Sequence, residues 1–386
     1  MQTFEGYRRP DGSVGIRNHV LVIPSVMCST HVVQKLLARY PELVGIPHQH
    51  GCSGIGSDFD QTLRTLIGMG RNPNVASVLI VGLGCESVQS NLIADGIAIT
   101  GKPVETIVMQ EVGGTTKAYD LGMAVVERLL LEAQEMQTET VPLSELIVGT
   151  ECGGSDACSG ISANPSLGVA SDLIIREGGT VILSETTEFI GAEHILARRA
   201  GDQRIKQQLL AIVQACEDGA RRMGVDIRGA QPTPGNMAGG LTTIEEKSLG
   251  CIYKGGTTEI REVIPYAQRP STRGLVVMDT PGNDVESVVG MVAGGAQVVV
   301  FTTGRGSPTG SPIAPVIKVA SNTPMYRRMS ENMDVNAGTI VEGVETPEIV
   351  GQRIFDAILA AASGKQTQAE ELGHREFAIN RIGPSM

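Results

Sequence analysis

The sequence predicts an α/β protein of two domains, with mainly parallel sheet flanked by helices and a Rossmann-like variant as the second domain. Glycine makes up 48 of the 386 residues, about 12 % against about 7 % in an average protein, which suits tight turns and close backbone approaches. Only 6 Phe and 6 Tyr are present and no Trp, so the core must be aliphatic. Short β-branched runs bounded by turn residues alternate with helical stretches, which is typical of this class.

The aliphatic runs are continuous rather than alternating, as expected for strands that helices cover on both faces. They predict eight strands: His19–Pro24, Ser77–Leu83, Glu105–Met109, Leu146–Thr150, Thr180–Ser184, Gly274–Asp279, Gln297–Thr302 and Val316–Ala320. Five helices are predicted between or after them: His31–Arg39, Lys117–Gln134, Gly191–Met223, Asp284–Ala293 and Glu348–Ala362.

A domain boundary is expected near residues 136–145, where a charged helix gives way to Gln137–Thr140 and Pro142 precedes a new aliphatic strand. We therefore expect an N-terminal α/β domain over 1–140, serving dimerisation, and a C-terminal Rossmann-like, metal-bearing catalytic domain over 141–386. The polar segment from Gly373 to Met386 is expected to pack back on the body.

Charge and composition exclude several function classes. The 31 basic and 42 acidic residues leave a net charge of −11, which argues against a nucleic-acid binder. No run of 18 apolar residues exists and the N-terminus is polar, so neither a membrane span nor a secretory signal is expected. Seven cysteines in a chain of this size favour a reduced, cytoplasmic protein.

The unusual polar residues follow predicted strands, and open parallel sheets bind ligands at those strand ends. The segment Thr150–Pro165 is rich in small polar groups around Cys152, and helix capping by its serines and aspartate is the alternative. Glu185 and Glu188 come just after another strand, with His194 further along. Carboxylate, thiol and imidazole suit a metal or acid–base site, although glutamates also favour a first helical turn.

Two further segments carry imidazole and thiol groups. His48–Gly56 contains His50 and Cys52, where the alternative is a glycine turn with surface histidines. Val81–Ser87 places Cys85 after a Gly-x-Gly turn at a helix start, which favours the thiolate. The third glycine of a dinucleotide fingerprint is missing there, so a nicotinamide site has weak support.

Polar groups for a carboxylate-bearing substrate are expected from four residues. Arg17 and Asn18 follow an N-terminal glycine turn, which an ordinary solvated turn would also explain. Asn236 opens a helix in a glycine-rich segment, and Arg305 lies between two glycines after a strand. Lys247, if buried, is a candidate base or anchor. The sequence has no Gly-x-Ser-x-Gly elbow, Walker lysine loop or His-Glu-x-x-His helix, which excludes serine esterases, P-loop NTPases and common zinc proteases.

Taken together these segments resemble the altronate/galactarate dehydratase family. The resemblance spans the chain and rests on the segments Gly6–Asn18, Gly51–Cys52, Gly82–Glu86, Glu151–Pro165, Glu185–His194, Pro234–Gly250 and Phe301–Gly306. It implies a hydro-lyase that needs Fe²⁺ or a similar divalent metal such as Mn²⁺, a dimerising N-terminal domain and a metal-bearing C-terminal domain.

One departure from the family concerns its small N-terminal β-clip domain, since this sequence starts directly at the body. The resemblance therefore implies a large subunit with a separately encoded small β-clip partner, as well as a homodimer. The related sulfolactate sulfo-lyases share that division, so carbon–sulfur lysis is the second interpretation.

The expected reaction removes the α-proton of a sugar acid and expels its β-hydroxyl, yielding a 2-keto-3-deoxy acid. Metal ligands are expected from Cys152, Glu185 and Glu188, proton transfers from His50, Lys247 and His194, and substrate contacts from the four residues named above. Two alternatives stay open: an NAD-binding Rossmann protein, and an iron–sulfur dehydratase built on Cys52, Cys85 and Cys152, whose spacing is unlike that of a cluster motif.

Overall fold

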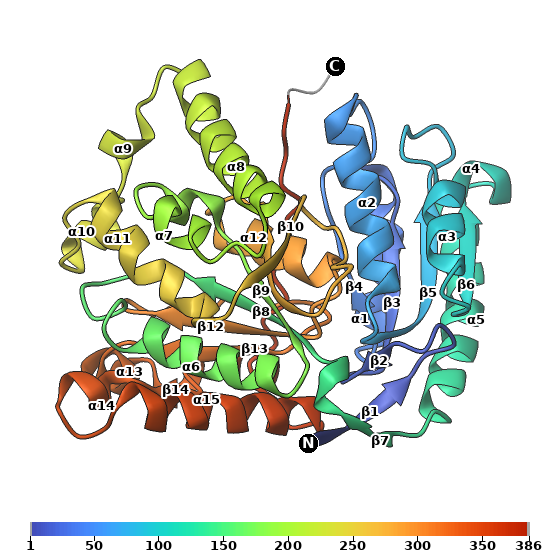
Figure 1. The fold of residues 1–386 in the computed structure, drawn as a ribbon. Coiled ribbons are helices and arrows are strands. Elements are labelled where there is room, and N and C mark those ends of the chain that lie inside the picture. The colour runs from blue at the N-terminus through green and yellow to red at the C-terminus, as the bar shows by residue number, and fades with distance from the viewer. Residues whose placement is uncertain (1, 384–386) are drawn as a thin grey trace.

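The computed structural model describes residues 2–383 and places two parallel sheets side by side, each flanked by helices (Figure 1). The N-terminal half, blue to teal in the figure, is built on a four-stranded sheet in the order β4-β3-β5-β6. All its pairings are parallel. Its strands are β3 (His19–Pro24), β4 (Val44–Gly45), β5 (Val75–Gly82) and β6 (Val104–Val108).

Helices cover both faces of this sheet because the strands alternate apolar residues to the two sides. Val20 and Val22 pack on one face with α1 (Thr30–Arg39) and α5 (Thr115–Gln134). Leu21 and Ile23 belong to the core on the other face. That second face is covered by α2 (Ser57–Arg71) and α3 (Ser90–Ala98).

The C-terminal half contains a seven-stranded sheet in the order β10-β11-β9-β8-β12-β13-β14, and all of its pairings are parallel. Its strands are β8 (Ile147–Cys152), β9 (Thr180–Leu183), β10 (Ile260–Ile264), β11 (Gly274–Met278), β12 (Val298–Thr303), β13 (Val316–Ala320) and β14 (Val335–Asn336). The longer helices of this half are α6 (Ala163–Arg176), α8 (Gln203–Arg222), α12 (Asp284–Ala293) and α15 (Pro347–Ala362). The α/β class with parallel sheet between helices is confirmed.

The remaining elements are short. The shorter α-helices are α4 (Met109–Val112), α7 (Glu193–Ala197), α9 (Ile227–Ala230), α10 (Pro234–Ala238), α11 (Ile244–Cys251), α13 (Thr323–Arg328), α14 (Gly338–Val341) and α16 (Gln368–Glu371). The 3-10 helices are η1 (Met27–Ser29), η2 (Leu143–Glu145), η3 (Thr186–Phe189), η4 (Ile252–Gly255) and η5 (Ser330–Asn332). No helix in residues 2–383 is long and apolar enough to cross a membrane.

A small antiparallel sheet joins the start of the chain to the connection between the halves. β1 (Thr3–Arg8) pairs with β2 (Val14–Gly15) and with β7 (Glu139–Pro142). Phe4 and Val141 are buried on this sheet and pack into the core of the seven-stranded half. The N-terminal strand therefore contacts both halves.

Every predicted strand has a counterpart, but the predicted helix Gly191–Met223 is wrong. The chain forms α7 and then α8, with Ala200 bridged to Ile260 between them. The Asp202 side chain caps α8 by accepting the N–H of Ile205 at 2.7 Å, so a new helix begins there. No range was predicted for helices α2, α3 and α6, although helix starts were expected near Cys85 and in Thr150–Pro165. Strands β4, β10 and β14 and the antiparallel sheet were not predicted.

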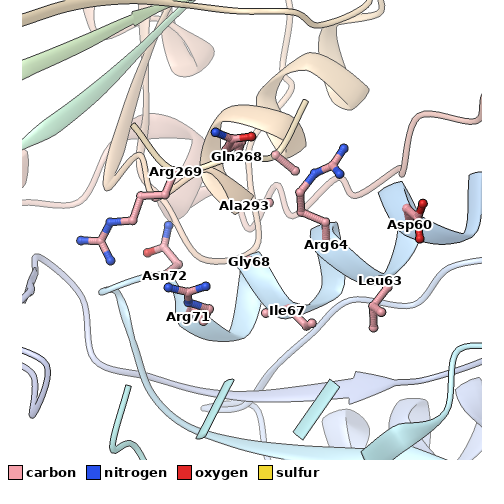
Figure 2. Close-up of a pocket in the computed structure, with 12 residues that line it drawn as sticks. Asp60, Leu63, Arg64, Ile67, Gly68, Arg71, Asn72, Gln268, Arg269 and Ala293 are labelled. Carbon is pink, nitrogen blue, oxygen red and sulfur yellow. The ribbon is translucent and has the colours of Figure 1, made fainter. Parts of the chain in front are cut away.

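The seam between the halves is formed by α2 and α12. The Asn72 amide, at the end of α2, donates to the carbonyls of Val292 and Ala296 at 2.7 and 2.9 Å. Arg64 Nε donates to the Tyr266 carbonyl at 2.8 Å. A cavity of about 330 Å³ opens along this seam, with apolar α2 side chains below and arginines at its rim (Figure 2).

The C-terminal segment packs back across this seam, as expected. Gln61 Nε2 donates to the Asn380 carbonyl at 2.8 Å, and the N–H of Ile382 donates to Asp58 at 3.0 Å. The prediction for this segment is confirmed up to residue 383, and its last residues, 384–386, lie outside the described part.

Candidate functional site

The order of the seven strands creates a crevice at their carboxyl ends. β8 lies between β9 and β12, and the chain leaves β8 toward β9 but returns on the β12 side later. The loops after β8 and β12 meet there, because the N–H groups of Gly304 and Arg305 both donate to the Gly154 carbonyl, at 3.2 and 2.9 Å. Such a topological switch point is where open α/β sheets bind ligands.

A buried cluster of acids and thiols lies at these strand ends. We call it the acidic–thiol cluster and define it as Glu151, Cys152, Glu185, Glu188, Cys251 and Lys254. Cys152 Sγ donates to Glu188 Oε2 at 2.8 Å and lies 3.4 Å from Cys251 Sγ. Lys254 Nζ donates to Cys152 Sγ at 2.9 Å, forms an ion pair with Glu185 and lies 3.4 Å from Glu188. At most 5 % of any of these side chains that carry charge is exposed.

Two more charged groups border the cluster. Lys247 of α11 pairs with the second oxygen of Glu188 at 3.1 Å, and 14 % of its side chain is exposed. Asp284 begins α12 and lies beside Gly153, where any Cβ would collide with its carboxylate. A glycine at 153 is therefore what allows this acid to approach the end of β8.

Local backbone geometry aims the glutamates inward. Glu185 has a left-handed backbone, with φ of 68°, which is strained for a residue with a long side chain. Its N–H donates to Thr280 Oγ1 at 2.7 Å, and its carboxylate accepts the N–H of Cys152 at 2.9 Å. Glu151 accepts from Ser287 at 2.6 Å and from Ser184 at 3.1 Å. These bonds hold carboxylates in positions that burial would otherwise disfavour.

The acids of the site have opposite pKa shifts. Burial and the nearby Glu188 charge raise the pKa of Glu185 to about 7 and that of Asp284 to about 6. Burial and the charge of Glu185 raise the pKa of Glu151 well above its usual range. Burial also opposes ionisation of Glu188, but the ammonium groups of Lys247 and Lys254 outweigh it and lower its pKa to about 2. Perturbations of both signs within one small site are characteristic of functional centres.

The donor set fits a divalent cation. The cluster and its two bordering residues, Asp284 and Lys247, hold four carboxylates but only two ammonium groups, those of Lys247 and Lys254. Among the described residues, Oε1 of Glu151 and Oε1 of Glu185 are buried without a hydrogen-bond partner. Ligand atoms of Cys152, Glu188 and Cys251 lie within 4.8 Å of one another, and so do those of Glu151, Glu185 and Asp284. Thiolate and carboxylate together suit borderline ions such as ferrous iron.

A cavity of about 290 Å³ opens next to the cluster, and both Cys251 of the cluster and the bordering Lys247 line it. Its other walls are polar groups of the loop after β8, including Asp156 and Ser159, and residues of α11. Asp156 holds this wall together, since it accepts from Ser159, Ser321 and Asn322 at 2.7 to 2.9 Å. The cavity is large enough for a small polyhydroxy acid, and carboxylate, hydroxyl and ammonium groups lie among the mainly apolar surface that lines it.

Six of the ten predicted site residues lie in this region. Cys152, Glu185, Glu188 and Lys247 are in direct contact with one another or with Lys254. Asn236 Nδ2 donates to the Ser155 carbonyl at 3.0 Å, so it supports the cavity wall. Arg305 lies at the mouth of the crevice with an exposed side chain.

The structure does not bring the other four to the cluster. All five N–H groups of Arg17 are used by Glu370 and by the carbonyls of Ile16, Ala361 and Lys365, which leaves none for a substrate. Asn18 is bound between Arg9 and the Ala133 carbonyl. We therefore correct the predicted substrate role of these two residues to a structural one.

The two predicted catalytic histidines also lie apart from it. His50 is in the loop between β4 and α2 of the N-terminal half, where burial lowers its pKa. His194 is on α7 with an exposed ring that contacts none of the cluster residues among those described. The catalytic roles of both histidines were predicted from the residue type alone, and the residue type does not indicate which sheet edge a loop lies at.

Sequence reasoning missed Lys254, Cys251 and Asp284, and did not single out Glu151. Glu151 precedes Cys152 at a strand end, so its position was a usable signal. The other three come from elements far along the chain: Lys254 contacts Cys152 across 102 positions and Cys251 contacts it across 99. No local pattern marks such partners.

Comparison with known proteins gives consistent matches along the chain. A family model described as "D-galactarate/Altronate dehydratase, C-terminal" matches residues 143–385, and one described as "D-galactarate dehydratase/Altronate hydrolase, second domain" matches residues 6–134. Galactarate dehydratase (L-threo-forming) of Escherichia coli is 41 % identical over 99 % of this chain and 77 % of its own length.

Two other relatives differ in their named reactions. Altronate dehydratase of Bacillus subtilis is 35 % identical over 100 % of this chain and 79 % of its own length. The β subunit of (2R)-sulfolactate sulfo-lyase of Chromohalobacter salexigens is 38 % identical over 99 % of this chain and 98 % of its own length.

Proposed function

Because the chain belongs to the D-galactarate/altronate dehydratase family, we propose that it dehydrates a sugar acid of the altronate or galactarate type to a 2-keto-3-deoxy acid. Its dehydratase relatives make it an enzyme, a carbon–oxygen lyase. The observation that carries the substrate class is the cavity of about 290 Å³ beside the acidic–thiol cluster, which is lined by Cys251 of that cluster, by the bordering Lys247 and by polar groups of the loop after β8. A hydroxy acid in that cavity lies against groups able to move protons.

The proposed metal is Fe²⁺, or another divalent ion such as Mn²⁺, held by Cys152, Glu185 and Glu188 together with the other members of the two convergent groups, Cys251, Glu151 and Asp284. The excess of carboxylates over ammonium groups and the unpartnered oxygens of Glu151 and Glu185 support it. When bound, such an ion withdraws charge from a substrate carboxylate and so acidifies the α-carbon.

The chain's own residues supply the rest of the proposed mechanism. Lys247 is the proton donor to the leaving hydroxyl, because its pairing with Glu188 raises its pKa against the effect of burial and keeps it protonated. Arg305 holds a substrate carboxylate at the crevice mouth. Asn236 and Asp156 keep the cavity wall in place through Ser155 and Ser159. The buried lysine, Lys254, positions Cys152 and Glu185 by direct contact.

The proposed assembly is a cytoplasmic homodimer through the N-terminal half, together with a small β-clip subunit. The similarity to a protein named as subunit β supports a partner chain. The same similarity supports a second candidate reaction, in which sulfite rather than water leaves a sulfolactate-type substrate. Both reactions begin with loss of a proton next to a carboxylate, so one cavity serves either.

Replacing Glu188 by Gln tests the proposal. We expect turnover of altronate, galactarate or sulfolactate, assayed anaerobically with Fe²⁺ and with the small subunit present or absent, to fall at least about 100-fold. Iron content after desalting falls with it, because a ligand and the partner of Lys247 are lost together. Glu245→Gln, which changes an exposed carboxylate on α11, the helix that carries Lys247, is the control and keeps wild-type activity. Full activity with retained iron in Glu188→Gln removes this residue from the site.

A further inference from the structure

Three cysteines outside the acidic–thiol cluster follow three neighbouring strands of the four-stranded sheet. Cys28 comes after β3, Cys52 after β4 and Cys85 after β5, and these strands are adjacent in the order β4-β3-β5. Since the strands are parallel, their carboxyl ends meet at one edge. The fold therefore brings to one edge three thiols that are 24 or more positions apart in the sequence.

Hydrogen bonds tie the three cysteine-bearing loops to one another. The N–H of Met27 donates to the His50 carbonyl at 3.1 Å, which joins the loops of Cys28 and Cys52. The N–H of Val88 donates to the Gly51 carbonyl at 3.0 Å, which joins the loops of Cys52 and Cys85. Ser25 Oγ donates to Glu86 at 2.5 Å and closes the ring between the first and third loops. We call this arrangement the three-thiol edge.

Glycines next to the cysteines make the close approach possible. Gly51, directly before Cys52, has a φ of 102°, and a Cβ there would collide with the Ser25 carbonyl. Gly84, directly before Cys85, has a φ of 124°, and its N–H donates to Glu86 at 2.5 Å. Glu86 also accepts the N–H of Leu83 at 3.2 Å. The Glu86 carboxylate thus accepts the backbone N–H groups that a nucleotide phosphate would otherwise bind. The thiols remain as the groups at this edge that can bind a ligand.

All three cysteines are exposed and form no disulfide. Within residues 2–383, the His50 imidazole beside them has a ring nitrogen without a hydrogen-bond partner. His50 is 6 % exposed, and its Nε2 is buried with no hydrogen-bond partner in the described chain. His50 and Cys52 line one small cavity. The three sulfurs do not all lie within 4.8 Å of one another, so they are spaced too widely to converge on one ion as they stand. Three sulfurs spaced more widely than the ligands of a single ion suit an inorganic group larger than one ion.

We infer that Cys28, Cys52 and Cys85 form a binding site for an iron–sulfur cluster of the [4Fe–4S] class, held by three thiolates. Cysteine thiolates are the usual ligands of such clusters. Three ligands leave one iron without a protein thiolate and accessible from solvent, since the edge is exposed. The inference corrects the grouping expected from the sequence: Cys152 is buried with Cys251 in the other half, and Cys28 takes its place.

The test uses the full chain purified without oxygen and reconstituted with iron and sulfide. We expect a brown protein with a broad absorption band at about 400 nm, about four sulfides per chain and about five irons, one of which belongs to the acidic–thiol cluster. Single replacements Cys28→Ser, Cys52→Ser and Cys85→Ser each reduce the sulfide content at least about twofold, and the triple variant has none. Cys158→Ser and Cys216→Ser, thiols of intermediate exposure in the other half, are matched controls and keep it.

Two outcomes overturn the inference: a wild-type chain that takes up no sulfide, or a triple variant that keeps the band. Circular dichroism establishes that the variants are folded, which the exposure of these thiols favours. Glu188→Gln keeps the band, because it lies at the other site, so loss of the proposed metal at the acidic–thiol cluster and loss of this cluster are separately measurable.

Discussion

At the level of single residues, a buried carboxylate of the site is stabilised by several polar and charged neighbours rather than by one ion-pair partner. Glu188 accepts from a thiol and faces two lysines, whereas Glu185, three residues earlier, has an unpartnered oxygen and a raised pKa. The two acids thus differ in protonation because of their neighbours, not their type. A centre that must both hold a cation and release protons needs such a difference.

His48 gives a residue-level prediction for pH dependence. Its Nδ1 accepts the N–H of His50 at 3.1 Å and its Nε2 lies 2.7 Å from the Pro24 carbonyl, so the neutral ring with hydrogen on Nε2 satisfies both. Burial lowers its pKa to about 4, below about 6.5 in an unfolded chain. The unfolded state therefore binds the proton first, and stability falls as pH decreases from about 6.5 toward 4.

The measurement is urea unfolding at pH 7 and pH 5 for the wild type and for His48→Gln. The wild type is expected to lose about 2 kcal/mol more than the variant between these pH values. Equal losses in the two proteins would contradict a neutral, buried imidazole at this position.

At the level of elements, the approach of α2 to α12 depends on a missing side chain. Gly68 lies in the middle of α2, and a Cβ there would collide with the Ala293 carbonyl of α12. The glycines at 68 and 70 also explain why α2 was not predicted from the sequence, because glycine lowers helix propensity. Packing of the helix, not propensity, therefore decides that it forms.

Gly68→Ala is expected to destabilise the protein by about 1–3 kcal/mol, since backbone must move to admit the methyl group. Gly219 of α8 is the matched position because a Cβ there meets only the end of the Arg222 side chain, at 3.8 Å. Gly219→Ala should stabilise by up to about 1 kcal/mol. Thermal midpoints of both variants provide the comparison, and a shift of the same sign in both would refute the packing argument.

At the level of the whole molecule, the two halves share a core. One apolar cluster runs from the four-stranded sheet through α2 and α3 to α12 and the seven-stranded sheet. Arg17 adds a polar tie, because it joins the start of β3 to the end of α15 and to Glu370 of α16. These contacts link residues more than 340 positions apart, so we expect the chain to unfold as one cooperative unit.

Arg17→Met separates a structural role from the substrate role that its sequence context predicts. Removing four partly buried hydrogen bonds and one exposed one should cost about 2–4 kcal/mol of stability, while the KM of the folded enzyme stays at the wild-type value. Arg327→Met, at an exposed arginine of α13, should change neither. A KM that rises at least about tenfold with unchanged stability would restore Arg17 to the substrate site.

How much of the site was predictable depends on distance along the chain. Glu185, Glu188 and Cys152 each follow a strand, and the common edge of a parallel sheet brings strand ends together, so their proximity was foreseeable. The same reasoning failed for His50, because it does not say which of two sheets a loop belongs to. Lys254 and Cys251 could not be found this way, since they come from η4 and the end of α11, which reach the sheet edge only in three dimensions.

By itself, the sequence determined the α/β class, the eight main strands and the family. Aliphatic runs and short motifs are local patterns, so they can be recognised without knowing which residues contact them in the folded chain. Only the tertiary structure decided that Arg17 is a structural tie, that Lys254 lies among the acids and that three distant thiols share one edge. The physical reason is that a charge or thiol takes its chemistry from the groups around it. Those groups are gathered by strand order and helix packing, which no short stretch of sequence encodes.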